Sequence, residues 1–157
     1  MAAGSIGLAV ALTGCPASAE PTGATGTSST APPSVSGRPA VLTTAGLVDA
    51  EEADGTRVRW TTTWRACFAA HPEDTGTVVG WEAQVGTPEG SSPQVDELPS
   101  ACVELDVATG TDAGRSGRAV QLADAQALTY RVRAVHTDGT VTPWTEPVRV
   151  GTQSSGG

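Results

Sequence analysis

Two of the three cysteines in this 157-residue chain are placed so that they could form a disulfide. Cys67 and Cys102 are about 35 residues apart, and closing a loop of that length contributes roughly 3.5 to 4 kcal/mol in the chain-entropy estimate. In an oxidising compartment an even pair favours this bond. The alternative is a pair of unlinked buried thiols. Neither cysteine has a histidine or a second cysteine at zinc-ligand spacing, so we expect no metal here.

The other polar residues include few candidates for a catalytic site. The segment His71-Pro72-Glu73-Asp74 places an imidazole beside two carboxylates, but it is typical of a polar turn between strands. His136 ends an alternating row, where we expect a half-buried histidine. Residues 49–54 resemble a calcium loop, yet Trp60 stands where a bidentate glutamate is needed, so we expect a solvated acidic loop. The sequence therefore predicts no enzyme, no cofactor and no metal site.

The tryptophans are the strongest candidates for ligand contacts. Trp60 and Trp81 fall in the inward rows of predicted strands and are expected in the core. Trp64 and Trp144 lie near predicted strand ends, where a partly exposed aromatic could contact a sugar ring or a protein surface. The alternative is that both rings close the ends of the fold.

The stretch from Leu122 to Val150 contains two of these candidate residues, His136 and Trp144, and its pattern predicts a β-hairpin. Leu128, Tyr130, Val132 and Ala134 alternate with polar residues, as in a strand with one buried face. The Asp138-Gly139 pair is a turn signal. Residues 140–150 contain two prolines, which favours an edge strand.

Further strand signals recur at short intervals along the chain. The predicted strands are residues 41–48, 56–64, 77–85, 102–107 and 117–122, followed by the two strands of the hairpin. The inward rows of the second and third are Val58, Trp60, Thr62 and Trp64, and Val79, Trp81, Ala83 and Val85. No stretch has a sustained helical period. We expect an all-β fold, a seven-stranded antiparallel β-sandwich.

The order of these landmarks resembles the fibronectin type III family. The similarity rests on Trp60 and Trp81, on Leu122 before the inward row of residues 128–134, on Gly139, and on the closing segment 145–150. It covers roughly residues 39–150, and a general immunoglobulin-like sandwich is the alternative. The resemblance implies a noncatalytic binding domain whose contacts come from the loops at one end. Here that end includes residues 137–140, so Asp138 is a further candidate contact.

The first 15 residues predict export. Ile6 to Leu12 is a short apolar run, too short to span a membrane, and the segment Leu12-Thr13-Gly14-Cys15 that follows resembles a bacterial lipobox. The resemblance implies a signal peptide over residues 1–15 and lipid attached to Cys15. Two alternatives are a chance match and cleavage after the Ala17-Ser18-Ala19 segment, which would remove Cys15 and release a secreted protein.

Composition divides the rest of the chain into a linker, a domain and a tail. Residues 16–38 are rich in Pro, Ser, Thr, Gly and Ala and predict a disordered linker, residues 39–151 form the domain, and residues 152–157 form a disordered tail. All nine basic residues are Arg, which suggests a GC-rich genome such as that of an actinobacterium. The net charge of −8 argues against nucleic acid as a partner.

These features predict a lipid-anchored module on the extracellular face of the cell membrane. We expect a monomer that contacts a protein or glycan of the envelope without catalysis. The alternative is a secreted accessory domain that binds polysaccharide through Trp64 and Trp144.

Overall fold

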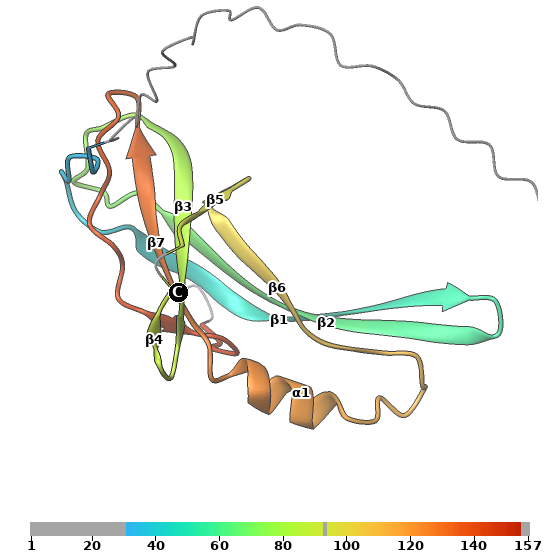
Figure 1. Cartoon of the computed structure of the whole chain (residues 1–157). Helices are drawn as coiled ribbons and strands as arrows, with labels where there is room; N and C mark the ends of the chain where they lie inside the picture. The colour runs from blue at the N-terminus through green and yellow to red at the C-terminus, as the bar shows by residue number, and fades with distance from the viewer. Residues whose placement is uncertain (1–30, 93, 155–157) are drawn as a thin grey trace, which may run out of the picture. The chain divides into compact units, whose positions relative to one another are not determined.

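The computed structural model describes residues 31–92 and 94–154 of the chain (Figure 1). These residues are mostly β-structure with one short helix. The elements are β1 (Val41–Asp54), β2 (Arg57–Ala69), β3 (Val78–Thr87), β4 (Gly90–Ser91), β5 (Asp96–Leu98), β6 (Cys102–Gly110), α1 (Arg118–Ala125), β7 (Thr129–His136) and β8 (Val148–Arg149).

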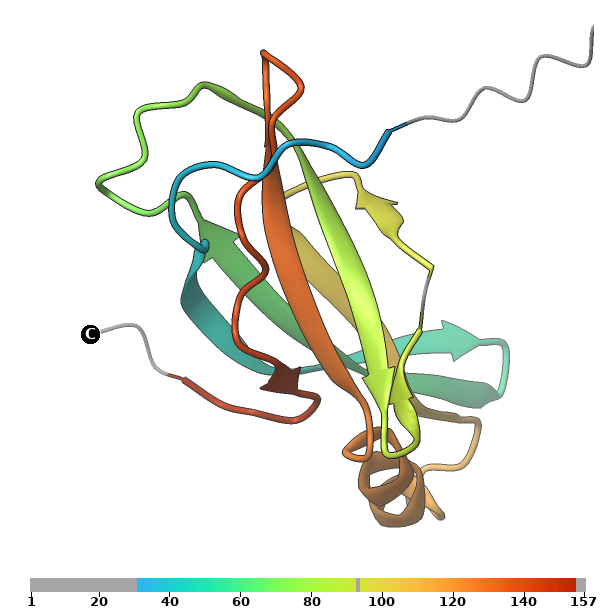
Figure 2. The same cartoon turned by 60° about the vertical axis from the view of Figure 1, so that its left-hand side comes forward.

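The strands form two antiparallel sheets that pack face to face. One sheet has the order β1-β2-β6, and the other has the order β4-β3-β7-β8, with β5 also paired to β3. Figure 2 shows the β3–β7 pair crossing in front of the β2–β6 pair. The core between them consists of Ala40, Ala45, Trp64, Ala66, Phe68, Ala83, Val103, Val107, Val132 and Val150. The predicted all-β sandwich is confirmed at this level.

The alternation of apolar side chains decides which face each strand buries. On β2, Trp60, Thr62 and Trp64 are buried as predicted, and on β7 Val132 and Ala134 are fully buried. Val79 departs from the prediction and is 61% exposed. Val79 is the extra residue at a register shift between Val78 and Gly80, so it has no partner on β7 and its side chain is exposed, while Ala83 further along β3 is buried as predicted.

The predicted strand over residues 117–122 is wrong, since this segment forms α1. Arg, Ala, Gln and Leu are good helix formers, and eight residues are too few for their spacing to separate the two periods. The helix places Arg118, Gln121, Leu122 and Ala125 on one side. Leu122 and Ala125 pack against the core, while the Gln121 side-chain amide donates to the Thr109 carbonyl and accepts from the Thr109 amide, both at 3.1 Å.

A long hairpin of β1 and β2 extends beyond the core, with α1 running beneath it (Figure 1). Trp60 is 1% exposed there, and its indole donates to Asp112 Oδ1 at 3.3 Å. A Cβ atom on Gly110 would overlap the Trp60 indole, so glycine is required at this close approach.

The acidic stretch predicted as a solvated loop is the end of β1, and its carboxylates hold the α1 segment. Asp49 accepts from Thr62 Oγ1 at 2.6 Å and pairs with Arg118 and Arg115 at 2.9 Å each, while Glu51 pairs with Arg115 at 2.7 Å. The Thr62 hydrogen bond, followed by that of Arg118, lowers the pKa of Asp49 to about 2. This cluster joins β1 to the residues around α1.

We expect the Asp49 cluster to make stability depend on pH. Because the folded-state pKa of Asp49 lies below its unfolded value, its contribution is present above about pH 4 and is lost as the pH falls through about 2. Asp49 is 39% exposed, so solvent screening limits the effect to about 1 kcal/mol or less. The thermal midpoint of Asp49→Asn should therefore fall less than that of the wild type between pH 5 and 2. Glu52→Gln on the same strand is the control and should follow the wild type; a parallel fall in all three proteins would contradict the assignment.

The segment before β8 is not a regular edge strand, and it pairs with β7 through both backbone and side-chain hydrogen bonds of Thr142 and Thr145. Val141 bridges to Val135, but Pro143 then interrupts the ladder. The buried Thr142 and Thr145 hydroxyls accept from the Ala134 and Val132 amides, each at 3.0 Å. These amides therefore keep acceptors although only residues 148–149 are regular strand.

Ordered pairing extends past both expected domain limits. In the predicted linker, the Ser36 amide donates to the Val141 carbonyl at 2.8 Å. In the predicted tail, the Thr152 carbonyl accepts from the Trp64 indole at 3.1 Å, and the Ser154 amide donates to the Ala45 carbonyl at 2.9 Å. Packing of the domain thus includes residues on either side of 39–151.

Candidate functional site

Trp64 lies in the middle of the core. Its side chain is 0% exposed, and its ring centroid is 6.0 Å from that of Tyr130. The indole nitrogen is already bonded to the Thr152 carbonyl. Trp64 therefore presents no surface to a ligand, and the prediction that it is a contact residue is corrected.

Trp144 lies instead on the outer side of the sheet formed by β3 and β7. The Arg133 guanidinium carbon is 4.4 Å from the centroid of the Trp144 ring, and that of Arg131 is 5.2 Å away. Arg131 and Arg133 point outward because they alternate with the buried Val132 and Ala134. The ring is partly exposed and rests against two cations, an arrangement stabilised by the attraction between a guanidinium and an aromatic face.

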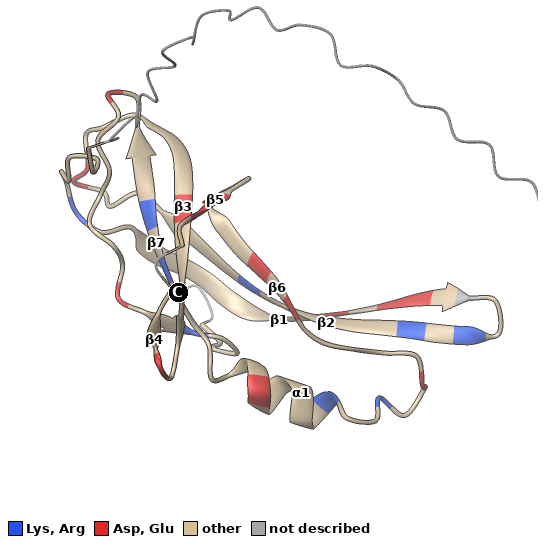
Figure 3. Ribbon diagram, viewed as in Figure 1, with Lys and Arg blue, Asp and Glu red and all other residues tan. Residues whose placement is uncertain are grey.

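The two arginines differ in their other partners. Arg133 Nε donates to Glu82 Oε2 at 2.6 Å, so its charge is paired. Arg131 Nε donates to the neutral Gln84 Oε1 at 2.8 Å, and among the described residues Arg131 has no carboxylate partner. Figure 3 shows the basic positions along β7 beside the acidic position on β3.

Arg149 adds a second cation without a carboxylate partner among residues 31–92 and 94–154. It is exposed and stands opposite Thr129 in the β7–β8 register. Directly opposed residues share a face, so Arg149 lies on the same side as Arg131. We call Trp144, Arg131, Arg133, Arg149, Glu82 and Gln84 the Trp144 face. It combines an aromatic surface with excess positive charge in a chain whose net charge is −8.

Asp138 is occupied by its own turn. Its Oδ1 atom accepts from the Thr140 amide at 2.9 Å and from the Thr140 hydroxyl at 2.7 Å. These bonds lower the pKa of the Asp138 carboxyl group, whose residue is exposed. The side chain fixes the loop between β7 and the following segment, and its contribution to a contact would come through loop shape.

The structure joins a histidine and an aspartate that are 62 residues apart in the sequence. His136 Nε2 lies 3.0 Å from Asp74 Oδ2, and His136 Nδ1 lies 3.1 Å from Thr140 Oγ1. Both the His136 and Asp74 side chains are only 4% exposed. Gly76 lies against the imidazole so closely that a Cβ atom there would be 2.9 Å from the ring. Such a pair could move protons in an open cleft, but here it is sealed from solvent.

His71 lies apart from this pair and lines a groove of about 420 Å³ between the start of β1 and the residues before β8. Its Nδ1 atom accepts from the Glu73 amide at 3.2 Å, which matches the predicted polar turn. Glu146 also lines the groove, without a hydrogen bond to His71 in the described structure. Among residues 31–92 and 94–154, no three His, Cys, Asp or Glu side chains gather as metal ligands would.

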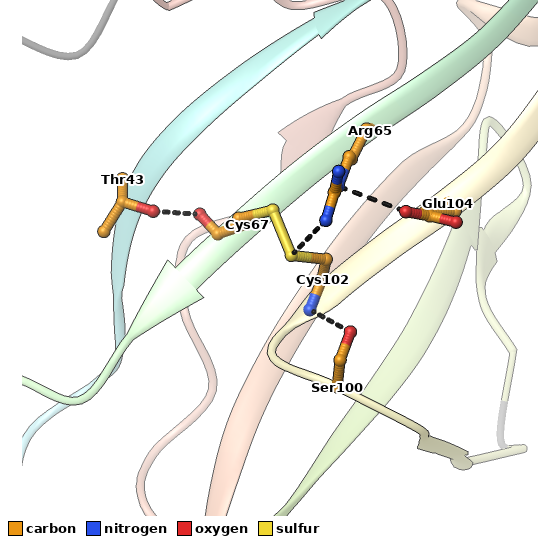
Figure 4. Close-up of a disulfide and its surroundings, with 6 residues drawn as sticks. All are labelled: Thr43, Arg65, Cys67, Ser100, Cys102 and Glu104. Carbon is orange, nitrogen blue, oxygen red and sulfur yellow. Dashed lines mark hydrogen bonds and ion pairs between the residues drawn. A yellow bond between two sulfur atoms is a disulfide. The ribbon is translucent and has the colours of Figure 1, made fainter.

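Cys67 and Cys102 form a disulfide between β2 and β6 (Figure 4). They are register partners, and both are half-buried on the side of the sheet that faces away from the core. The pairing predicted from the sequence is therefore present. Cys15, the predicted lipidation site, lies outside the described residues.

No family model, curated protein or solved structure matches the chain. None of the helices in the described part of the chain is long and apolar enough to cross a membrane.

Proposed function

We propose that this chain is a lipid-anchored, noncatalytic binding module on the outside of the cell, with a fibronectin type III-like fold, and that it contacts an envelope protein through the Trp144 face. The single observation that carries the proposal is the partly exposed Trp144 ring held against two guanidinium groups. Tryptophan and arginine are the residues most enriched at the energetic centres of protein interfaces.

The location of this module is supported by two separate features. A disulfide persists in oxidising compartments and is rare in the cytosol. The sequence before the domain has the lipobox-like segment ending at Cys15. The two-sheet antiparallel arrangement, together with the order of landmark residues, supports the fibronectin type III-like assignment.

A polysaccharide ligand is less well supported than a protein. Sugar rings stack on exposed aromatic faces, and a surface that binds a polysaccharide requires more than one such aromatic face. Trp64 is buried, and guanidinium groups already lie over the Trp144 ring. The excess charge of Arg131 and Arg149 instead favours an acidic surface on a protein partner.

Binding to envelope preparations tests the contact surface. The purified full chain carrying Cys15→Ser should bind saturably to envelopes of its native host, and protease treatment of the envelopes should abolish binding. Trp144→Ala should weaken binding at least tenfold, about 1.4 kcal/mol, as expected at the centre of an interface. Arg57→Ala, at an exposed arginine on the distant β1–β2 hairpin, is the matched control and should bind normally. Binding that survives protease but is lost after glycan removal would overturn the protein-ligand proposal, as would equal binding by Trp144→Ala.

The intact mass of the mature protein tests the anchor. Membrane fractions should contain a species that begins at Cys15 with added lipid mass, and Cys15→Ser should remove it from the membrane. A soluble species that begins at Glu20 would discard the anchor and support secretion.

A further inference from the structure

The disulfide joins two strands that other bonds already hold in place. Cys67 and Cys102 are opposite each other, and the next pair is closed by the hydrogen bond from the Phe68 amide to the Ala101 carbonyl, at 2.8 Å. The Cys67 carbonyl accepts from Thr43 Oγ1 at 2.9 Å, and the Cys102 amide donates to Ser100 Oγ at 3.2 Å (Figure 4). None of these bonds needs the sulfur–sulfur bond, so breaking it leaves the two thiols facing each other on an intact sheet.

The sulfur atoms lie on the solvent side of that sheet. On β2 the side chains that alternate with Cys67, Ala66 and Phe68, are buried in the core, so Cys67 points away from it. The neighbouring Arg65 and Glu104 side chains are exposed, at 54% and 58%. A small thiol, or the reactive sulfur of a protein dithiol, can therefore approach the bond without unfolding the domain.

The surroundings of the two sulfur atoms are unequal. Arg65 Nη2 donates to Cys102 Sγ at 3.8 Å, while Arg65 Nε pairs with Glu104 at 3.1 Å. Cys67 Sγ has no such donor among the described residues. A cation beside a sulfur stabilises the thiolate, and the more stable thiolate is the better leaving group in disulfide exchange. Attack at Cys67 is therefore favoured over attack at Cys102.

We propose that the Cys67–Cys102 bond is an exchangeable redox site that reacts with an external dithiol by attack at Cys67. The attacking thiolate forms a bond to Cys67 Sγ, the Sγ–Sγ bond breaks, and its electron pair leaves on Cys102 as a thiolate beside Arg65. The second thiol of the reductant loses its proton and attacks its partner sulfur in the mixed disulfide. This releases Cys67, which takes up the proton. Two electrons pass from the dithiol, which becomes a disulfide, to the cysteine pair.

A monothiol trap measures which sulfur is attacked. The full chain carrying Cys15→Ser is exposed to 2-mercaptoethanol in native buffer, free thiols are alkylated, and mixed disulfides are located by peptide mass mapping. We expect the adduct on Cys67 to exceed that on Cys102 about three- to tenfold. Arg65→Gln should remove most of this bias and slow the reaction, and Arg65→Lys should restore part of it. Arg59→Gln, at an exposed position on the same face of β2, should behave as the wild type.

A second measurement separates native exchange from reduction through unfolding. The rate of reduction by dithiothreitol should change little in low urea, and the far-ultraviolet circular dichroism of the reduced protein should retain its β-sheet signal. Equal adducts on both cysteines, no effect of Arg65→Gln, or a rate that rises steeply with urea would each overturn the proposal. These outcomes are independent of whether the Trp144 face binds a partner.

Discussion

Replacement of both Cys67 and Cys102 by serine is expected to lower the free energy of unfolding by about 3.5 to 4 kcal/mol. The bond closes a loop with a sequence separation of 35 residues, and this loop contains β3, β4 and β5 of the opposite sheet. Without the bond, the unfolded chain gains the freedom to separate these ends. We expect the variant to stay folded, because the β2–β6 ladder and the core do not depend on the sulfur atoms.

Urea unfolding followed by tryptophan fluorescence measures this loss. The wild type reduced with dithiothreitol should unfold at the same midpoint as the double serine variant, because both lack only the cross-link. The Cys15→Ser variant is the control and should match the oxidised wild type. A loss below about 1 kcal/mol would contradict the loop-closure account and would mean that the unfolded chain remains compact without the bond.

Asp74→Ala is expected to lower the free energy of unfolding by about 3 kcal/mol, although it lies in a loop. The substitution leaves His136 Nε2 without its partner at a side chain that is 4% exposed, and it removes the acceptor of the Gly76 amide. A buried polar group that loses its partner retains the cost of desolvation.

The neighbouring carboxylate supplies a matched control. Glu73 pairs with Arg38 at 2.7 Å, but both side chains are 62% exposed, so Glu73→Ala should change stability by less than about 0.5 kcal/mol. Urea unfolding of both variants gives the comparison. Equal small losses would show that the His136–Asp74 pair contributes no more than a surface ion pair.

The sequence predicts the sandwich well where residues alternate along one strand. The inward row of β2 from Trp60 to Trp64 and the pairing of Cys67 with Cys102 follow from local pattern and cysteine number, whereas Val58, predicted in the same row, is 36% exposed near the hairpin end. The role of Trp64 could not be obtained in this way, because the predicted strand ends there while β2 continues to Ala69. A residue expected at a strand end is therefore in the middle of a strand and in the core.

The contacts that the sequence misses depend on topology. His136 meets Asp74 only because β3 and β7 pair and bring the loop before β3 to the end of β7. The grouping of Trp144 with Arg131 and Arg133 similarly requires the chain to double back after the turn at Gly139. The helical state of residues 118–125 becomes favourable through contacts with Thr109 and Asp49, which no local pattern contains.

The contact between Gln121 and Thr109 also limits self-association of the protein through the edge of its sheet. β6 is the outer strand of its sheet, and an outer strand with free amides and carbonyls is a template on which a strand of another molecule can add. The Gln121 amide engages both backbone groups of Thr109 in the way a neighbouring strand would. One side chain thus closes this position of the sheet to the addition of a strand from another molecule, which disfavours aggregation.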